Sequence, residues 1–255
     1  MPNSIINILL NEVGDVTWFA GRFFRELFKP RFEFKEFLKQ CYYIGYMSLS
    51  LVATTAFIMG LVITMQSRPT LVEFGAEAWL PKMVSVSLIR EIAPVITALI
   101  CAGKIGSGIG AELGSMKVTE QIDAMEVSGT NPFKYLVVTR VLATTLMIPL
   151  LAVFADVISL YGAYLGANID GVVSWKLYWN QVFETLQFKD LLPSISKTFL
   201  FGFAIGIIGC YKGFNSDKGT EGVGQSANSA VVVSSLLVFI LDLLAVQFAN
   251  IFGLT

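Results

Sequence analysis

Apolar residues run along this chain in five long stretches that are separated by shorter polar connections. These stretches cover residues 42–66, 83–115, 141–167, 191–210 and 227–252. A bilayer core about 30 Å thick needs about 20 apolar residues in a helix that crosses it. The pattern therefore predicts five transmembrane helices, which places the two ends of the chain on opposite sides of the membrane.

The second stretch is longer than a single crossing needs. At about 1.5 Å per residue, a helix over 83–115 would reach roughly 50 Å. We therefore expect it to project beyond the bilayer or to break. Pro94 lies inside it and is expected to kink it, because proline removes a backbone hydrogen bond.

The basic residues predict the orientation of the spans. They are densest ahead of the first span, at Arg22, Arg25, Lys29, Arg31, Lys35 and Lys39. The connection after that span holds only Arg68 and Lys82. Because Lys and Arg are enriched on the cytoplasmic side, we expect a cytoplasmic N-terminus, cytoplasmic connections at 115–133 and 213–225, and a C-terminus on the outer side, which in the family named below is the periplasm.

Residues 1–40 precede the transmembrane domain, 41–255, and have an amphipathic pattern. Apolar residues recur there at helical spacing, at Ile5, Ile6, Leu9, Leu10, Val13 and Val16. This spacing favours a helix that lies in the membrane interface. A cytosolic helix packed on the protein itself is the alternative. The connection 168–190, with Trp175 and Trp179, is expected to lie at the outer surface, where tryptophan is favoured.

Composition agrees with an all-α integral membrane protein. The 255 residues are 55% hydrophobic and 15% charged, against about 25% charged in soluble domains, and the mean hydropathy is +0.67. The net charge of −1, without a basic patch, gives no indication of nucleic acid. The chain has no histidine, which excludes histidine-based catalysis and removes the commonest metal ligand. No metal site is predicted, and the three scattered cysteines do not form a disulfide pattern.

Small residues recur every four positions in the second span. One row is Ala102, Gly106, Gly110 and Gly114, and a second row is Gly103, Ser107, Ala111 and Ser115. Such rows let helix backbones approach closely in lipid, so Gly103, Gly106, Gly110 and Gly114 are predicted helix-packing residues. The contact is either within the chain or across a homodimer. Gly103-Lys104 is not a P-loop, because Ala98 stands where the first glycine is needed.

Charged residues inside spans are costly, roughly 2.5–3.5 kcal/mol each. With the orientation above, five of them gather in the outer half of the membrane: Arg90, Glu91, Asp156, Lys197 and Asp242. One interpretation is ion pairing that fixes the helix register. The other is an outward polar cavity that binds a lipid headgroup, with apolar walls for the tails.

A short amphipathic helix is predicted at residues 116–127, on a cytoplasmic turn. Val118, Ile122 and Met125 share one helical face, and acids occupy much of the rest. An apolar face of this kind inserts into a groove on a partner. The predicted contact residues for an energy-supplying partner are Glu120, Gln121, Asp123, Met125 and Glu126. An ordinary surface helix is the alternative.

The run LIREIAPVITALICAGKIGSGIGAELGSMKVTEQIDAMEVSGTNPFKYLVVTRVLA resembles the MlaE-type permeases, the membrane subunits of MCE-associated lipid-transporting ABC systems. The likeness extends from about Ile44 to the C-terminus and includes Lys197 and Asp242. It implies that 41–255 is a permease domain with a coupling helix at about 116–127. It also implies a homodimer, two cytoplasmic ATPase subunits, a periplasmic MCE-domain protein and phospholipid as cargo.

The resemblance further implies a multi-pass protein of the bacterial inner membrane with a role in outer-membrane lipid asymmetry. ATP and Mg would be bound by the partner ATPase, so no cofactor is expected on this chain and it is not expected to be an enzyme. The predicted function is movement of phospholipid between the inner membrane and a periplasmic MCE carrier, driven by ATP hydrolysis on separate subunits.

Two other classes of function remain open on the residues alone. A secondary transporter or channel would use the intramembrane charges, although the halves show no inverted repeat. A membrane-embedded enzyme is the third class, but the chain has no histidine and no nucleophile elbow.

Overall fold

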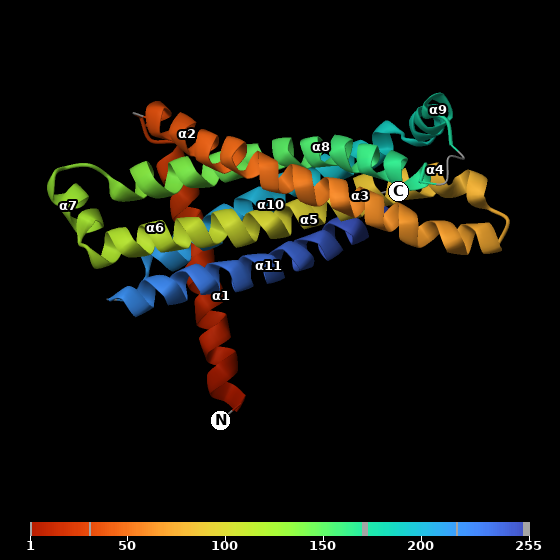
Figure 1. Ribbon diagram of the computed structural model, residues 1–255. Helices are drawn as coiled ribbons and strands as arrows, with labels where there is room; N and C mark the ends of the chain where they lie inside the picture. The colour runs from red at the N-terminus through yellow and green to blue at the C-terminus, as the bar shows by residue number, and fades with distance from the viewer. Residues whose placement is uncertain (1, 31, 170–172, 218, 252–255) are drawn as a thin grey trace. The chain divides into compact units, whose positions relative to one another are not determined.

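The computed structural model describes residues 2–30, 32–169, 173–217 and 219–251, and the side chains of residues 2–6, 8 and 9 are not part of this description. Every regular element among the described residues is a helix (Figure 1). The predicted all-α fold class is therefore confirmed. Several residues used for the predictions lie outside the description: the Ile5, Ile6 and Leu9 side chains, Arg31 and Phe252.

Five helical segments in the described part of the chain are long and apolar enough to cross a membrane. They are Phe34–Glu73, Glu77–Val118, Phe133–Ala167, Phe188–Phe214 and Thr220–Ile251. This confirms the five predicted spans. Each segment is longer than its predicted apolar stretch, because Lys, Glu and Gln at the ends are good helix formers and continue the helix into polar surroundings.

The first span shows this extension. It begins with α2 (Phe34–Cys41), continues through the π turn η1 (Tyr42–Tyr46) and ends with α3 (Met47–Glu73). The predicted start of this span at residue 42 is therefore eight residues inside the helical segment Phe34–Glu73 by the numbering of the chain. Part of the predicted N-terminal segment 1–40 thus belongs to the first long helix.

The second span contains two π turns. Its elements are η2 (Glu77–Trp79), α4 (Leu80–Ser87), η3 (Leu88–Ile92), α5 (Ala93–Cys101), η4 (Ala102–Gly106) and α6 (Ser107–Val118). Pro94 has no N–H with which to bond the carbonyl of Arg90. The backbone N–H of Ala93, one residue earlier, donates to the carbonyl of Leu88, which widens this turn to π geometry. The interruption expected at Pro94 therefore takes the form of a π turn.

By its internal contacts the chain divides into two compact units, and we describe each by itself. The first unit comprises Met1–Ile44, Cys101–Thr145 and Gly202–Leu237. In it, α1 (Pro2–Leu27) contacts the π helix η5 (Phe133–Val138). Phe19 and Phe23 of α1 are buried, and the rings of Phe19 and Phe133 lie 4.9 Å apart. Figure 1 shows α1 crossing the direction of α6 instead of following it.

The opposite side of α1 remains apolar and exposed. Its exposed apolar residues are Leu10, Val13, Trp18 and Phe24, followed by Phe28 beyond the helix end. Helix α1 therefore packs on the protein with one side, as one sequence interpretation expected, and presents the kind of apolar side that the interfacial interpretation requires.

The glycine row of the second span divides into two groups in this unit. If Cβ atoms were added at Gly106, Gly110 and Gly114, they would meet residues of α11 (Thr220–Ile251). The Cβ atom at Gly110 would lie 3.2 Å from the backbone oxygen of Ser226. Ser226 of α11 also donates a hydrogen bond to the carbonyl of Gly110 at 3.1 Å. A Cβ atom at Gly103 would meet nothing within 4 Å. The structure thus places three of the four glycines against α11 of the same chain.

The second unit comprises Gly45–Ile100, Leu146–Phe201 and Val238–Thr255. Glycines bring α3 and α8 (Thr139–Ala167) together in it. A Cβ atom at Gly60 would lie 1.9 Å from the backbone oxygen of Ser159, and one at Gly162 would lie 2.3 Å from that of Phe57. No larger residue fits at either position without separating the helices.

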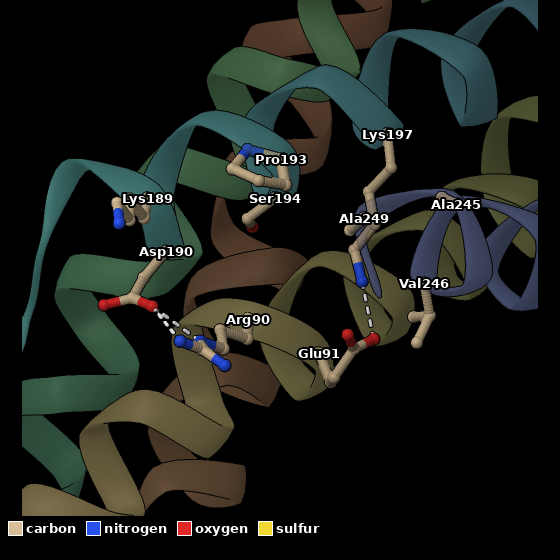
Figure 2. Close-up of a pocket in the computed structure, with 10 residues that line it drawn as sticks. All are labelled: Arg90, Glu91, Lys189, Asp190, Pro193, Ser194, Lys197, Ala245, Val246 and Ala249. Carbon is tan, nitrogen blue, oxygen red and sulfur yellow. Dashed lines mark hydrogen bonds and ion pairs between the residues drawn. The ribbon is translucent and has the colours of Figure 1, made fainter. Parts of the chain in front are cut away.

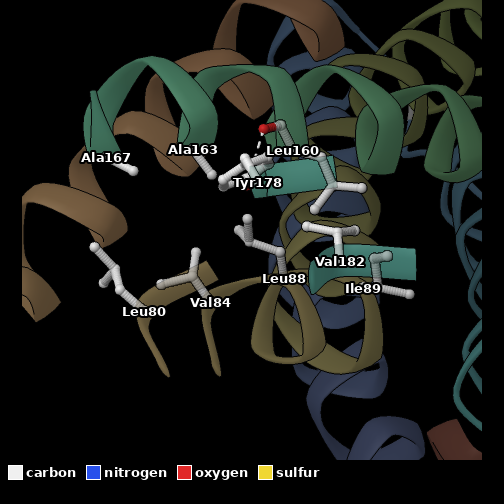
Figure 3. Packing of buried hydrophobic residues seen from close by; sticks show 9 residues of the cluster. All are labelled: Leu80, Val84, Leu88, Ile89, Leu160, Ala163, Ala167, Tyr178 and Val182. Carbon is white, nitrogen blue, oxygen red and sulfur yellow. Dashed lines mark hydrogen bonds between the residues drawn. The ribbon is translucent and has the colours of Figure 1, made fainter. Parts of the chain in front are cut away.

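The predicted outer connection 168–190 contains a helix, α9 (Trp175–Thr185), instead of a surface loop alone. Ser174 caps it by accepting a hydrogen bond from the backbone N–H of Leu177. Tyr178 and Val182 are buried against α4 and α8 (Figure 3). The Tyr178 hydroxyl donates to the carbonyl of Leu160 at 3.2 Å, and burial raises its pKa. The cluster drawn in Figure 3 consists of Leu80, Val84, Leu88, Ile89, Leu160, Ala163, Ala167, Tyr178 and Val182.

Candidate functional site

The centre of the candidate site is Lys197, on α10 (Phe188–Phe214) in the second unit. Its ammonium nitrogen lies 2.5 Å from Oε2 of Glu91 and 2.8 Å from Oδ1 of Asp242. The Lys197 side chain is only 4% exposed. A buried cation needs such partners, since an unpaired charge in a low-dielectric interior is costly. The structure thus brings together three of the five predicted intramembrane charges.

Arg90 has a different partner, which the sequence analysis did not identify. Its Nε atom donates to Oδ1 of Asp190 at 2.6 Å (Figure 2). The other carboxylate oxygen of Asp190 accepts the backbone N–H of Gln187 at 2.9 Å, just before α10 begins. An acid in the first turn of a predicted helix is a known N-terminal signal. This signal would have pointed to Asp190 if the start of the helix had been predicted at residue 188 instead of residue 191.

Two cavities meet at Lys197. The smaller one has a volume of about 40 Å³ and lies among Arg90, Glu91, Asp190 and Lys197 (Figure 2). The larger one has a volume of about 540 Å³. It is lined from α10 and α11 by Leu192, Pro193, Ser196, Lys197, Leu200, Leu241, Leu244, Ala245, Phe248 and Ala249. Lys197 is the charged residue among those lining the larger cavity. The volume of this cavity is in the range of about 300–1,000 Å³ typical of ligand sites.

Asp156 lies outside this arrangement. It is 7% exposed, and its Oδ1 atom has no hydrogen-bond partner among the described residues. It lines neither cavity at Lys197. The predicted gathering of five charges therefore divides into a Lys197–Glu91–Asp242 cluster, an Arg90–Asp190 pair and a separate Asp156. Of the two cavities at Lys197, the smaller is bordered by charged side chains and the larger mostly by apolar ones.

The predicted coupling helix differs from the structure at its start. Helix α6 continues to Val118, and α7 covers only Gln121–Val127. Between them Glu120 adopts a left-handed conformation, with φ 58°. Because this conformation cannot continue an α-helix, residues 116–118 belong to the end of the second span. Figure 1 shows α7 in the turn after α6.

The exposure of α7 also differs from the predicted apolar face. Glu120, Gln121, Asp123 and Glu126 are exposed, whereas Met125 is half-buried and Ile122 is buried. Asp123 pairs with Lys117 at 2.9 Å. The exposed apolar residue of α7 is Val127, which is 90% exposed and which the sequence analysis did not single out. The residues available to a partner thus include Gln121, the three acids and Val127.

The segment that follows α7 is attached to α1. The amide of Asn131 donates to Oε2 of Glu26 at 2.9 Å, and Nζ of Lys134 donates to the carbonyls of Lys29 and Pro30. Burial raises the pKa of the Glu26 carboxyl. The hydrogen bond and charge of Lys29, the Asn131 amide and the Arg25 charge lower it, so that the net pKa lies below the ordinary value.

The described residues contain no group of three or more Cys, Asp or Glu side chains arranged to hold a metal ion. All three cysteines are free thiols, and Cys101 and Cys210 are buried. The chemistry of the described site is therefore that of ion pairs beside an apolar cavity.

Five membrane-length helices, buried intramembrane ion pairs and an apolar cavity define a multi-pass helical membrane protein. Comparison with known proteins makes this more specific. Residues 37–248 match the family described as Permease MlaE, and the chain belongs to this family.

Similar proteins extend over most of the chain. A probable ABC transporter permease protein of Rickettsia bellii is 37% identical over 239 residues, which cover 94% of this chain and 92% of that protein. A probable ABC transporter permease protein of Synechocystis is 35% identical over 87% of this chain and 84% of its own length. The chloroplastic protein TRIGALACTOSYLDIACYLGLYCEROL 1 of Arabidopsis thaliana is 30% identical over 90% of this chain and 65% of that protein. The chain is accordingly an ABC transporter permease embedded in a membrane.

Proposed function

We propose that this permease moves phospholipid between the bacterial inner membrane and a periplasmic MCE-domain carrier, driven by ATP hydrolysis on separate cytoplasmic subunits. The chain acts as a homodimer, with a cytoplasmic N-terminus and a periplasmic C-terminus. The ABC permease class favours this function over a secondary transporter or channel.

The observation that carries the proposal is the apolar cavity of about 540 Å³ with Lys197 in its lining. A phospholipid has apolar tails and an anionic phosphate. The leucine and phenylalanine side chains of the cavity suit the tails, and an ammonium group is a common partner of phosphate. The name of the Arabidopsis relative contains the name of a galactolipid, which also supports a lipid as cargo.

The exposed surface of α7 supports docking of an ATPase. Glu120, Asp123 and Glu126 offer negative charge, and Val127 offers an apolar contact. Helix α7 follows α6, which belongs to the same helical segment, Glu77–Val118, as Arg90 and Glu91. ATP binding would draw the α7 helices of the dimer together and compress the cavity.

Lipid retention tests the cargo. In Lys197→Met, the cavity keeps its apolar walls but loses its cation, so native mass spectrometry of the purified chain should detect less bound phospholipid. A tenfold decrease in the affinity for phospholipid corresponds to about 1.4 kcal/mol of binding free energy. Lys176→Met is the matched control, since Lys176 is exposed on α9 and lines neither cavity at Lys197. Equal phospholipid in the two variants would refute the assignment.

Coupling is tested at α7. Glu120→Arg or Asp123→Arg reverses charge on an exposed surface, so the chain should insert normally while ATP-dependent lipid transport with the reconstituted ATPase collapses. Transport that follows an ion gradient without ATP would contradict the proposal and favour the secondary transporter.

A further inference from the structure

Arg22 of α1, in the first unit, is a cation for which the described residues supply no counter-charge. Its Nε atom is buried and has no hydrogen-bond partner among them. The carbon atom of the guanidinium group lies 4.2 Å from the centre of the Phe133 ring, a cation–π contact. A guanidinium group has five N–H donors and no acceptor, and a buried donor without a hydrogen bond requires an explanation in a native fold. An acceptor that comes from outside the chain would provide one.

The acid expected to pair with Arg22 is bonded to other groups. Glu26 lies four residues further along α1, and residues at this spacing are neighbours on the surface of a helix. One carboxylate oxygen of Glu26 lies 2.5 Å from Nζ of Lys29, and the other accepts a hydrogen bond from the amide of Asn131 at 2.9 Å. The Glu26 side chain is 4% exposed. Because both of its oxygens are engaged, the Glu26 carboxylate leaves Arg22 without the usual ion pair.

The packing of α1 puts this guanidinium group at the level where membrane-length helices begin and end. The centre of the Phe19 ring lies 4.9 Å from that of Phe133 and 6.2 Å from that of Phe214. Phe133 begins the third membrane-length segment, and Phe214 ends the fourth. Helix α1 also crosses the direction of α6, which belongs to the second segment (Figure 1). A helix that crosses the spans at their ends lies along the membrane surface, where the phosphate groups of the lipids are.

The side chains around Arg22 on α1 suit a lipid. Trp18, one turn before Arg22, is exposed, and so are Phe24 and Phe28 after it. Arg25 is exposed as well and adds a second positive charge. A helix with exposed aromatic and basic side chains binds an anionic membrane through apolar burial and through attraction to the lipid charge. The planar fork of an arginine matches the oxygens of a phosphate group and can bond two of them at once.

We propose that Arg22 binds the phosphate group of an anionic phospholipid in the leaflet on which α1 lies, with the acyl chains of that lipid beside Trp18. The contact with Phe133 holds the guanidinium group in place, so little side-chain freedom is lost on binding. This site is separate from the cavity at Lys197, because Arg22 belongs to the first unit and Lys197 to the second. The lipid at Arg22 is a bound component of the permease and not its cargo, so the inference does not rest on the proposed function.

Trp18 provides a local reporter for this site. Replacement of the other tryptophans, Trp79→Phe, Trp175→Phe and Trp179→Phe, leaves Trp18 as the source of tryptophan fluorescence in the full chain. This chain is reconstituted into phosphatidylcholine vesicles that contain a rising fraction of phosphatidylglycerol with brominated acyl chains, which quench a tryptophan that they contact. Brominated phosphatidylcholine serves as the zwitterionic comparison. The affinity for phosphatidylglycerol should be higher by about tenfold, the factor expected for a hydrogen bond between charged groups.

Arg22→Gln keeps a polar side chain but removes the charge and the fork, so the affinities for the two lipids should become nearly equal. Arg25→Gln is the matched control, because it removes an arginine from an exposed position of the same helix, and it should keep most of the preference. Equal loss of the preference in the two variants would show a general attraction between charges and would overturn the inference. Equal quenching by the two lipids in the chain with Arg22 intact would overturn it as well.

A second measurement uses the chain with all its tryptophans and decides the matter if the substituted chain fails to insert. Native mass spectrometry of Arg22→Gln should detect fewer bound phosphatidylglycerol molecules than that of the native chain, whereas Arg25→Gln should match the native chain. Equal retention in all three would overturn the inference.

Two further arms identify the source of the phosphate. Millimolar inorganic phosphate should leave the quenching of Trp18 unchanged, and relief of the quenching would show a site for soluble phosphate instead of a lipid. Lys197→Met should also leave it unchanged, and loss of the preference in that variant would assign the lipid at Trp18 to the cavity at Lys197. These measurements need neither ATP nor transport, so a failure of the proposed function and a failure of this inference give different results.

Discussion

The guanidinium group of Arg140 lies 2.8 Å from a carboxylate oxygen of Glu112, yet the Arg140 side chain is 2% exposed and the Glu112 side chain is 53% exposed. The two ends of this ion pair are thus solvated very differently. Arg140 also donates to the backbone carbonyl of Leu136 at 3.0 Å. Glu112 is the acid that pairs with this buried cation, whereas water can replace the arginine as a partner of Glu112.

This asymmetry predicts which member of the pair is harder to remove. Glu112→Gln leaves the Arg140 charge buried without a counter-charge, which costs several kcal/mol in comparable cases. Arg140→Met fills the space and leaves a hydrated glutamate. We expect Glu112→Gln to lower the free energy of unfolding by about 1–3 kcal/mol more than Arg140→Met does. Thermal unfolding in detergent measures both, and the reverse order would contradict the argument.

Glu26 predicts an acid dependence of stability. Its pKa is lower in the folded chain than its ordinary value, so the folded state favours the ionised carboxylate. This contribution is complete above the ordinary value, about 4.3, and is lost as the pH falls through the lowered folded value. The stability difference between the native chain and Glu26→Gln should therefore be largest near neutral pH and shrink below about pH 4.

Thermal unfolding across this pH range measures the difference. Glu33→Gln is the matched control for replacing a glutamate by glutamine, because Glu33 is exposed just before α2, and its effect on the free energy of unfolding near neutral pH should be small. If the stability difference between the native chain and Glu26→Gln grew as the pH fell, the prediction would be wrong.

The close helix contact at Gly60 predicts that no larger residue is tolerated at this position. A Cβ atom there would lie 1.9 Å from the backbone oxygen of Ser159, so Gly60→Ala must separate α3 from α8. Overpacking of this kind costs about 1–3 kcal/mol or more, and the amount of folded protein in the membrane should fall. Gly103→Ala is the control, since its Cβ would meet nothing within 4 Å. Equal loss in both variants would show that glycine is needed for a reason other than this contact.

Val127 predicts a contact with the energy-supplying partner. It is 90% exposed at the end of α7, so Val127→Ser should leave the stability of the isolated chain unchanged. Full burial of a valine side chain stabilises by about 1.5–3 kcal/mol, so binding to the ATPase should weaken by about tenfold or more. Val72→Ser, an exposed valine on α3, is the control, and pull-down titration measures both.

The sequence predicted the number and type of the long helices because hydrophobic length is a local property. It also singled out Lys197, Glu91 and Asp242, each conspicuous in an apolar run, with ion pairing as one interpretation, and the structure brings these three together. It did not predict the partner of Arg90. Arg90 pairs with Asp190, a residue that the apolar pattern had placed in a connection, because the apolar run that predicted the span begins only at Leu191 whereas the helix begins at Phe188.

The coupling segment shows a different limit. Helical spacing put Val118, Ile122 and Met125 on one face, but this assumes one helix through residue 120. The left-handed backbone at Glu120 changes the direction of the chain, and neither glycine nor asparagine marks that position. As a result, Ile122 is buried inside the protein, whereas the periodicity had offered it to a partner, and Val127, which the periodicity did not single out, is exposed.

The π turn at Leu88–Ile92 holds one more residue than an α-helical turn would. Deletion of a single residue there would let this turn adopt ordinary α-helical geometry without interrupting the helical segment Glu77–Val118. Because the deleted residue is the extra one, the part of the helix on its N-terminal side would keep its orientation about the axis, and Leu80 and Val84 would still face Tyr178. The same deletion within α5, which has no extra residue to lose, would instead rotate that part by about 100° about the axis, and α9 would lose the surface on which it packs.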